Sequence, residues 1–177
     1  MGWARARADT FCQLKYKGEL MLIYIIRHGQ AHNGSHTGRD QDRTLTERGH
    51  QQAKAVGMYL KACEQQPVCV IASPFVRAQE TASDICAVLD QSIIADDRLG
   101  ADRGLTEMLA VLEDHRDKEA LAIVSHMPTV GQLESLLSIG PTASESSFWT
   151  GEAVTIRVDG DELIGGGEMV DRYRLAD

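Results

Sequence analysis

The stretch that decides the fold is Met21 to Gly29, MLIYIIRHG, in which six apolar residues lead directly into Arg27, His28 and Gly29. A continuous apolar run without polar alternation is typical of a strand buried on both faces of a parallel sheet. In open α/β sheets the functional crevice lies beyond the carboxyl ends of such strands. Here Arg supplies N–H donors for phosphate oxygens, His supplies a nucleophilic ring nitrogen, and Gly removes a side chain that would keep a bulky anion away. We therefore expect this triplet to lie in a functional site.

Composition and charge restrict the class of protein. The chain has 177 residues, a length that suits one domain with a single core, and 43% of them are hydrophobic. The net charge of −8 argues against nucleic acid or an anionic membrane surface as the partner, so we expect neither. Four cysteines, Cys12, Cys63, Cys69 and Cys86, form no Cys-x-x-Cys pair. They predict reduced thiols and a cytoplasmic location.

Residues 1–20 differ from the rest of the chain. They carry scattered charges, with no apolar run of signal-peptide length and no hydrophobic period. Met21 coincides with the first residue of the expected strand. We therefore expect residues 1–20 to be a flexible extension before a natural start at Met21, and residues 21–177 to form the functional domain. A shortened chain beginning at Met21 that failed to fold would remove this idea.

Strands and helices alternate from Met21 onward. The expected strands lie at residues 21–26, 68–72, 92–95 and 120–124, and the expected helices at residues 46–66, 74–89, 104–116 and 128–138. Thr46 is the expected N-cap of the first helix, and Pro67 is expected to stop it. The C-terminal part predicts two strands, at residues 148–158 and 162–169, joined by a turn at residues 159–161. This pattern indicates an antiparallel strand near the C-terminus. We expect an α/β fold, a single three-layer αβα sandwich around a mostly parallel sheet.

Arginine and histidine side chains follow three of the expected strands. Arg27 and His28 end the first strand, Arg77 lies in the first turn of the helix after the second, and His126 follows the strand at residues 120–124. Because the carboxyl ends of parallel strands share one edge, these four side chains are expected to converge. A lone His or Arg at such a place is more often structural, so the convergence carries the prediction. With no Cys nucleophile, Gly-x-Ser-x-Gly elbow or Walker loop, it indicates a phosphate site that uses histidine as nucleophile.

Four segments form a series that covers nearly all of residues 22–158. They are RHGQA at 27–31, LTERG at 45–49, SPFVRAQET at 73–81 and VSHMPTVG at 124–131. The series resembles the histidine phosphatase superfamily, most closely its short, SixA-type branch of phosphohistidine phosphatases. The resemblance implies that His28 is the phosphorylated nucleophile and that Arg27, Arg77 and His126 form the phosphate pocket. Larger relatives carry insertions that cap the site and recognise sugars or inositols, whereas this chain has room only for an open site that admits a phosphorylated protein side chain.

The expected mechanism is a double displacement without metal or cofactor. Neutral His28 attacks phosphorus, and water then hydrolyses the phosphohistidine. Arg27, Arg77 and a protonated His126 hold the phosphate oxygens. The two histidines therefore need opposite protonation states, which their neighbours must impose.

The proton donor to the leaving group is the place where the chain departs from the wider family. Many relatives use a Glu beyond the third or so strand, whereas residues 99–104 offer only Asp102. We assign the role to Asp40 in the polar loop, with Asp42 and Asp102 as alternatives, and interpret Glu80 as a solvated helix residue. An imidazole leaving group departs more easily than an alkoxide, so proton donation matters less for phosphohistidine.

Several alternatives stay open beside a phosphohistidine phosphatase acting on a phosphorylated protein. One is a small phosphomonoesterase of broad specificity for small phosphate esters, and another is a phosphate-binding module without catalysis. His28, His32 and His36 are spaced as three metal ligands on one helical face, although Gly29, Gly34 and Gly38 argue against that helix. A phosphoglycerate-type mutase is disfavoured because it needs a closed pocket.

Overall fold

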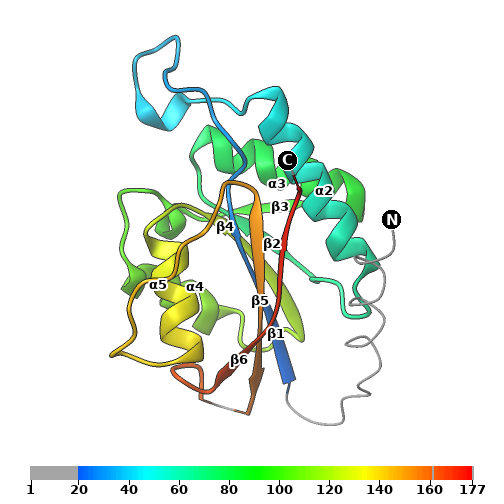
Figure 1. Ribbon diagram of the computed structural model, residues 1–177, viewed down its shortest axis with the longest axis vertical. Coiled ribbons are helices and arrows are strands. Elements are labelled where there is room, and N and C mark those ends of the chain that lie inside the picture. Colours follow the sequence, from blue (N-terminus) through cyan, green and yellow to red (C-terminus); the bar gives the residue numbers. More distant parts are fainter. Residues whose placement is uncertain (1–19, 161, 177) are drawn as a thin grey trace.

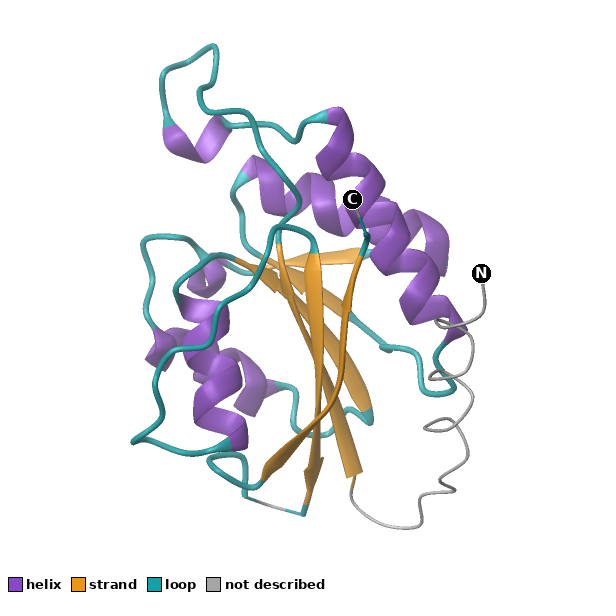
Figure 2. Ribbon diagram, viewed as in Figure 1, coloured by secondary structure: helices purple, strands orange, loops and turns teal. Residues whose placement is uncertain are grey.

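The computed structural model describes residues 20–160 and 162–176. In this part of the chain six strands form one sheet in the order β3-β2-β4-β1-β5-β6, and helices cover both faces (Figures 1 and 2). The strands are β1 (Leu20–Arg27), β2 (Val70–Ala72), β3 (Ile93–Ala95), β4 (Ala120–Ser125), β5 (Glu152–Asp159) and β6 (Gly167–Arg174). The α-helices are α2 (Glu47–Ala62), α3 (Val76–Leu89), α4 (Leu105–Asp114) and α5 (Thr129–Ser138), and short 3₁₀ helices are η1 (Asp40–Asp42) and η2 (Asp97–Leu99).

Strand β1 lies in the interior of the sheet, as its apolar run predicts. It pairs in parallel with β4, where Arg27 lies opposite Ser125, and antiparallel with β5. Strands β2 and β3 continue the parallel part. The prediction of a mostly parallel sheet with antiparallel pairing near the C-terminus is confirmed.

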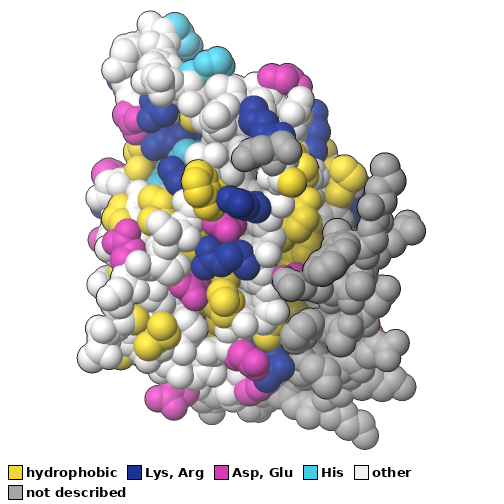
Figure 3. All heavy atoms as spheres, viewed as in Figure 1, with side chains coloured by type: hydrophobic (Ala, Val, Ile, Leu, Met, Phe, Trp, Pro, Cys, Tyr) yellow, Lys and Arg dark blue, Asp and Glu magenta, His cyan; other side chains and the backbone are white. Residues whose placement is uncertain are grey.

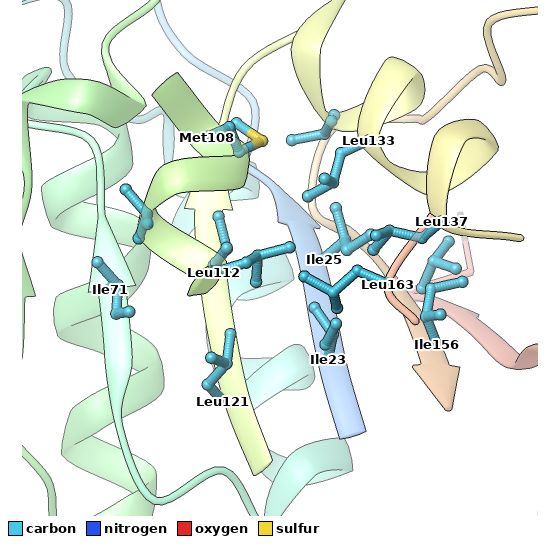
Figure 4. Close-up of a cluster of buried hydrophobic side chains, with 14 of the residues drawn as sticks. Ile23, Ile25, Ile71, Met108, Leu112, Leu121, Leu133, Leu137, Ile156 and Leu163 are labelled. Atoms are coloured by element: carbon cyan, nitrogen blue, oxygen red, sulfur yellow. The ribbon is translucent and has the colours of Figure 1, made fainter. Parts of the chain in front are cut away.

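Two apolar clusters hold the three layers together. Alternate residues of β1 point to opposite faces, so Ile23 and Ile25 belong to one cluster and Tyr24 and Ile26 to the other. Helices α4 and α5 close the first cluster, in which Met108, Leu112, Leu133 and Leu137 pack on the strands (Figure 4). Helices α2 and α3 close the second cluster. Burial of apolar side chains on both faces is the reason that β1 shows no polar alternation.

Helix α2 begins as predicted and ends earlier. The Thr46 side chain accepts a hydrogen bond from the Gly49 amide, which confirms the N-cap. The helix ends at Ala62 and not near Gln66, because tertiary hydrogen bonds take the place of helical ones. The Tyr24 hydroxyl donates to the Gln65 carbonyl at 2.6 Å.

The second C-terminal strand was placed wrongly by the sequence pattern. β6 spans residues 167–174, whereas the prediction was 162–169. The expected short turn is longer, since Gly165 adopts a left-handed φ of 71° and donates its amide to Leu136, and Leu163 turns into the core. β6 is an edge strand with mostly exposed residues, so it lacks the apolar alternation that marks a half-buried strand.

The predicted N-terminal extension lies outside the described residues except for Leu20. That residue belongs to β1, where it pairs with Asp159, and the boundary of the functional domain stays a prediction. Asp161 of the predicted turn also lies outside the described residues. Within the described part of the chain, no helix has the length and apolar character needed to cross a membrane.

Candidate active site

The predicted convergence occurs at the carboxyl ends of the parallel strands. His28 follows β1, Arg77 lies in the first turn of α3 and His126 follows β4. The imidazole rings of His28 and His126 have centroids 5.1 Å apart, and the Arg77 Nε–H donates to Nε2 of His28 at 3.2 Å. All three side chains are at least nine-tenths buried. The fold thus collects a cationic side chain and two imidazoles from three segments in one place.

The geometry of His28 defines its tautomer. Its Nδ1 lies 2.8 Å from the Gly29 carbonyl, which can only accept, so Nδ1 carries the proton and Nε2 carries the lone pair. Burial is the main cause that lowers the pKa of His28 to about 4; the contact with Gly29 opposes this, and the charges of Arg77 and Arg27 add to it. His28 is therefore a neutral imidazole at neutral pH, with its lone pair directed at the guanidinium of Arg77.

Arg77 uses three of its N–H groups within the protein. Besides the bond to His28, one terminal nitrogen donates to the Asp40 carbonyl at 2.8 Å and the other donates to the Asp40 carboxylate at 3.0 Å. Its guanidinium also lies over the Phe75 ring, 5.0 Å from the centroid. A rigid guanidinium fork in this position fits phosphate oxygens, which would replace the contact to His28.

His126 is held by two side chains that the sequence reasoning missed. Its Nε2 lies 2.8 Å from the Ser73 hydroxyl, and its ring contacts Phe75 edge to face. Its Nδ1 is buried and has no hydrogen-bond partner among the described residues. Burial first, then the proximity of His28 and Arg77, lowers the pKa of His126 to about 2. The pocket removes water and adds positive charge, so by itself it favours a neutral His126, and protonation of this ring by a bound phosphate stays a prediction.

Arg27 borders the site through the loop that precedes β5. Its terminal nitrogen donates to the Phe148 carbonyl at 2.7 Å, while its buried Nε has no hydrogen-bond partner among the described residues. The Gly151 amide donates to the backbone carbonyls of Arg27 and His28 at 3.2 and 3.0 Å. Residues 148–151, which the sequence pattern assigned to a strand, instead hold the end of β1 in place. The charge of Arg27 contributes to lowering the pKa of both histidines.

Asp40 reaches the site as the partner of Arg77. Its carboxylate also pairs with Arg43 at 2.9 Å, and its side chain is 58% exposed. The hydrogen bond from Arg43, aided by Arg77, lowers the pKa of Asp40 below its usual value. Asp40 is therefore an ionised carboxylate that orients Arg77, and it acts as an acid only after it takes up a proton.

The other candidate acids have separate places. Asp42 accepts a hydrogen bond from the Thr37 hydroxyl in the loop. Glu80 is not simply solvated as expected, since it accepts the Leu45 amide at 2.6 Å and so anchors the segment before α2. Asp102 lines the same groove as Asp40.

The structure gives a different reason for a glycine at position 29 from the one that the sequence suggested. A Cβ on Gly29 would lie 2.6 Å from the Gly49 carbonyl oxygen in the first turn of α2, so the missing side chain makes room for backbone and not for an anion. The Gly29 amide donates to the Thr81 hydroxyl at 3.0 Å, and Thr81 in turn donates to the Arg77 carbonyl at 2.7 Å. Thr81, fully buried, links the loop of His28 to the helix of Arg77. A polar residue one helical turn after the arginine was the signal that could have identified it.

An open groove of about 440 Å³ lies beside Phe75, whose ring contacts His126. It is lined by Arg39, Asp40, Gln41, Phe75, Ala101 and Asp102. Asp40 and Phe75 also contact Arg77, so two residues that line the groove touch a residue of the candidate phosphate pocket. It offers space for the group that carries the phosphate.

The three histidines at spacing four do not gather. His28 is buried at the end of β1, whereas His32 and His36 are exposed on the following loop, which is not helical. Within the described ranges no group of three or more His, Cys, Asp or Glu side chains has the arrangement of a metal site.

Comparisons with known proteins show which family the chain belongs to. Residues 23–117, more than half of the chain, match the model of the histidine phosphatase superfamily (branch 1), a range that includes Arg27, His28, Asp40 and Arg77. A phosphohistidine phosphatase SixA homolog from Haemophilus influenzae is 31% identical over 152 residues, which cover 74% of this chain and 90% of the relative. The transcription factor tau 55 kDa subunit of Saccharomyces cerevisiae is 38% identical over 86 residues; these cover 44% of this chain but only 20% of that longer protein.

A solved structure shows the same fold. The structure of the protein histidine phosphatase SixA complexed with tungstate superposes with a TM-score of 0.76 at 24% identity, covering 87% of this chain and 97% of that one.

Proposed function

The chain belongs to the histidine phosphatase superfamily, and we propose that it hydrolyses phosphohistidine on a protein through a covalent intermediate at His28. The observation that carries this proposal is the unprotonated Nε2 of His28, which lies against the Arg77 guanidinium in a buried site. A lone pair held beside a fork of N–H donors is what in-line attack on a phosphoryl group requires.

In the first step the Nε2 lone pair forms a bond to phosphorus while the bond to the leaving group breaks. The electron pair of that bond moves to the leaving nitrogen or oxygen, which takes a proton from Asp40, once this carboxylate has been protonated, or from solvent. The Arg77 Nε–H, which donates to Nε2 in the free site, turns to a phosphate oxygen as the N–P bond forms. Asp40 holds Arg77 in the orientation for this exchange.

In the second step a water molecule attacks phosphorus, the N–P bond breaks and the electron pair returns to His28. Arg77 and Arg27 stabilise the negative charge on the phosphate oxygens during both steps. His126 is buried beside His28, and its Nδ1 is free to interact with the phosphate. The negative charge of a bound phosphate raises the pKa of His126, so binding favours the protonated ring that the mechanism uses.

A phosphorylated protein side chain is the substrate class that we favour. The groove beside the histidines is open, and the similar H. influenzae protein is named a phosphohistidine phosphatase homolog. An imidazole leaving group also suits the ionised Asp40, because imidazole departs without strong proton donation, whereas an alkoxide requires Asp40 to take up a proton first. The cysteines of the described chain, Cys63, Cys69 and Cys86, are free thiols, which supports a cytoplasmic location.

A phosphomonoesterase for small phosphate esters is the second candidate. A groove of about 440 Å³ is within the size range of small-molecule sites. The deciding experiment compares kcat/KM on phosphohistidine proteins with kcat/KM on a panel of sugar phosphates, each with and without EDTA. A strong preference for the sugar phosphates overturns the favoured substrate class, and loss of activity in EDTA overturns a mechanism without metal.

Covalent catalysis has its own test. His28→Ala should abolish turnover, and acid-labile label from a phosphorylated substrate should appear on the wild type and be absent from the variant. Arg77→Ala should retain the label while slowing its formation, by analogy with the roughly 10²–10³-fold cost of losing one oxyanion donor. Label that persists in His28→Ala assigns the nucleophile to another residue, and a protein that binds phosphate without turnover is a phosphate-binding module.

A further inference from the structure

A large aromatic side chain is exposed at the rim of the site. Trp149 lies in the loop before β5 and is 66% exposed. Its amide donates to the Glu152 carboxylate at 2.7 Å, which fixes the loop, and the Arg174 guanidinium lies 5.2 Å from the centroid of its ring. An exposed Trp held by its own backbone and by a stacked Arg loses little conformational freedom when a partner binds.

The same loop is connected to the catalytic residues by backbone contacts. The carbonyl of Phe148, the preceding residue, accepts from Arg27, and the amide of Gly151 donates to the His28 carbonyl. Trp149 therefore lies within two residues of groups that contact both Arg27 and His28. A protein that places a phosphorylated side chain against His28 brings its neighbouring surface to this loop.

Charge indicates what kind of surface fits there. The protein is acidic, with a net charge of −8, yet arginines flank the site. Arg39 and Arg43 lie on the groove side, whereas Arg172 and Arg174 lie on β6 beside the Trp149 loop. Figure 3 shows dark-blue side chains over the upper half of the viewed face, with yellow and magenta side chains among them.

Arg174 differs from its neighbour Arg172. Arg172 is tied to the Glu152 carboxylate at 3.4 Å and to the Ser147 carbonyl at 3.0 Å. Arg174 is exposed, and no carboxylate of residues 20–160 or 162–176 pairs with it. Its guanidinium can therefore form an ion pair with a partner without first breaking one to a described residue.

We propose that Trp149 and Arg174 form a docking surface for the acidic face of the phosphorylated protein substrate, next to its phosphohistidine. The inference rests on the proposed function and adds the residues that recognise the carrier protein. Trp and Arg are the residue types that most often dominate binding energy at protein interfaces, and a positive patch on an acidic protein selects partners of negative charge. A free phosphorylated amino acid reaches His28 without touching this surface.

The test compares hydrolysis of the same phosphorus–nitrogen bond in a large and in a small substrate. The large substrate is a histidine-phosphotransfer domain of negative net charge, phosphorylated on its histidine with phosphoramidate, and the small substrate is free phosphohistidine. Trp149→Ala and Arg174→Glu should each raise KM for the phosphorylated domain about five- to tenfold with kcat unchanged, and leave kcat/KM for free phosphohistidine within about twofold.

Lys118→Glu is the matched control. It makes the same charge change, but at a residue before the start of β4, and the length of this strand separates it from the site by about 20 Å. It should change neither KM for the phosphorylated domain nor kcat/KM for free phosphohistidine. Raising the salt concentration should reduce the difference between wild type and Arg174→Glu.

The outcomes separate the two proposals. Normal KM for the domain in both variants, or equal losses on both substrates, overturns the docking surface while the proposed function stands. A wild type that hydrolyses sugar phosphates but neither phosphohistidine substrate overturns the proposed function, and with it this partner.

Discussion

Thr81→Val should separate the positioning of the nucleophile from its chemistry. The Thr81 hydroxyl accepts the Gly29 amide, and the Gly29 carbonyl in turn accepts Nδ1 of His28. Valine keeps the shape but removes the acceptor, which leaves a buried N–H without a partner at a cost of about 1–3 kcal/mol in the free energy of unfolding. Because this chain of bonds orients the His28 ring, kcat should fall on the order of ten- to a hundredfold.

Thr81→Ser is the matched control. It keeps the hydroxyl but loses a fully buried methyl group, which costs about 1 kcal/mol of stability. Urea unfolding followed by circular dichroism measures the stabilities, and single-turnover hydrolysis of a phosphohistidine protein measures the chemical step. Both variants should lose stability, whereas only the valine variant should lose much activity. Equal activity in the two variants, at the wild-type level, would refute the reasoning.

Two further expectations concern ionisation. Asp40→Asn should lower kcat/KM for alkyl phosphate esters much more than kcat/KM for phosphohistidine. Equal losses on the two substrates contradict the leaving-group argument. No loss on either substrate assigns the proton donor to Asp42, Asp102 or solvent. Because the pKa of folded His28 is lowered to about 4 from an ordinary value of 6.5, the unfolded chain binds more protons between these pH values. Stability should therefore be complete above pH 6.5 and fall by up to a few kcal/mol as the pH drops toward 4, and the acid limb of kcat/KM should lie near pH 4. A limb near pH 6.5, or stability that does not change between pH 7 and pH 4.5 in urea unfolding, speaks against the buried neutral imidazole.

Much of the framework could be predicted because its causes are local in the sequence. The apolar run of β1 reports burial on both faces, and Thr46 marks the start of α2 through its own side chain. Arg27, His28, Arg77 and His126 could be grouped from their places in the sequence, because parallel strands deliver the residues after their carboxyl ends to one edge of the sheet. The sequence by itself therefore determined the layers, the edge that holds the site and the residues that converge there.

Tertiary structure alone decided how those residues are held. Ser73 lies 53 residues from His126, Thr81 lies 52 residues from Gly29, and the Phe148 carbonyl that binds Arg27 lies 121 residues away. A hydrogen bond to a distant backbone group leaves no mark in the pattern of side chains, and the edge strand β6 pairs through its backbone with side chains that are mostly exposed. Protonation also depends on the assembled pocket: the low pKa of His126 comes from burial and from Arg77 and His28 beside it, and neither burial nor distance exists until the chain has folded.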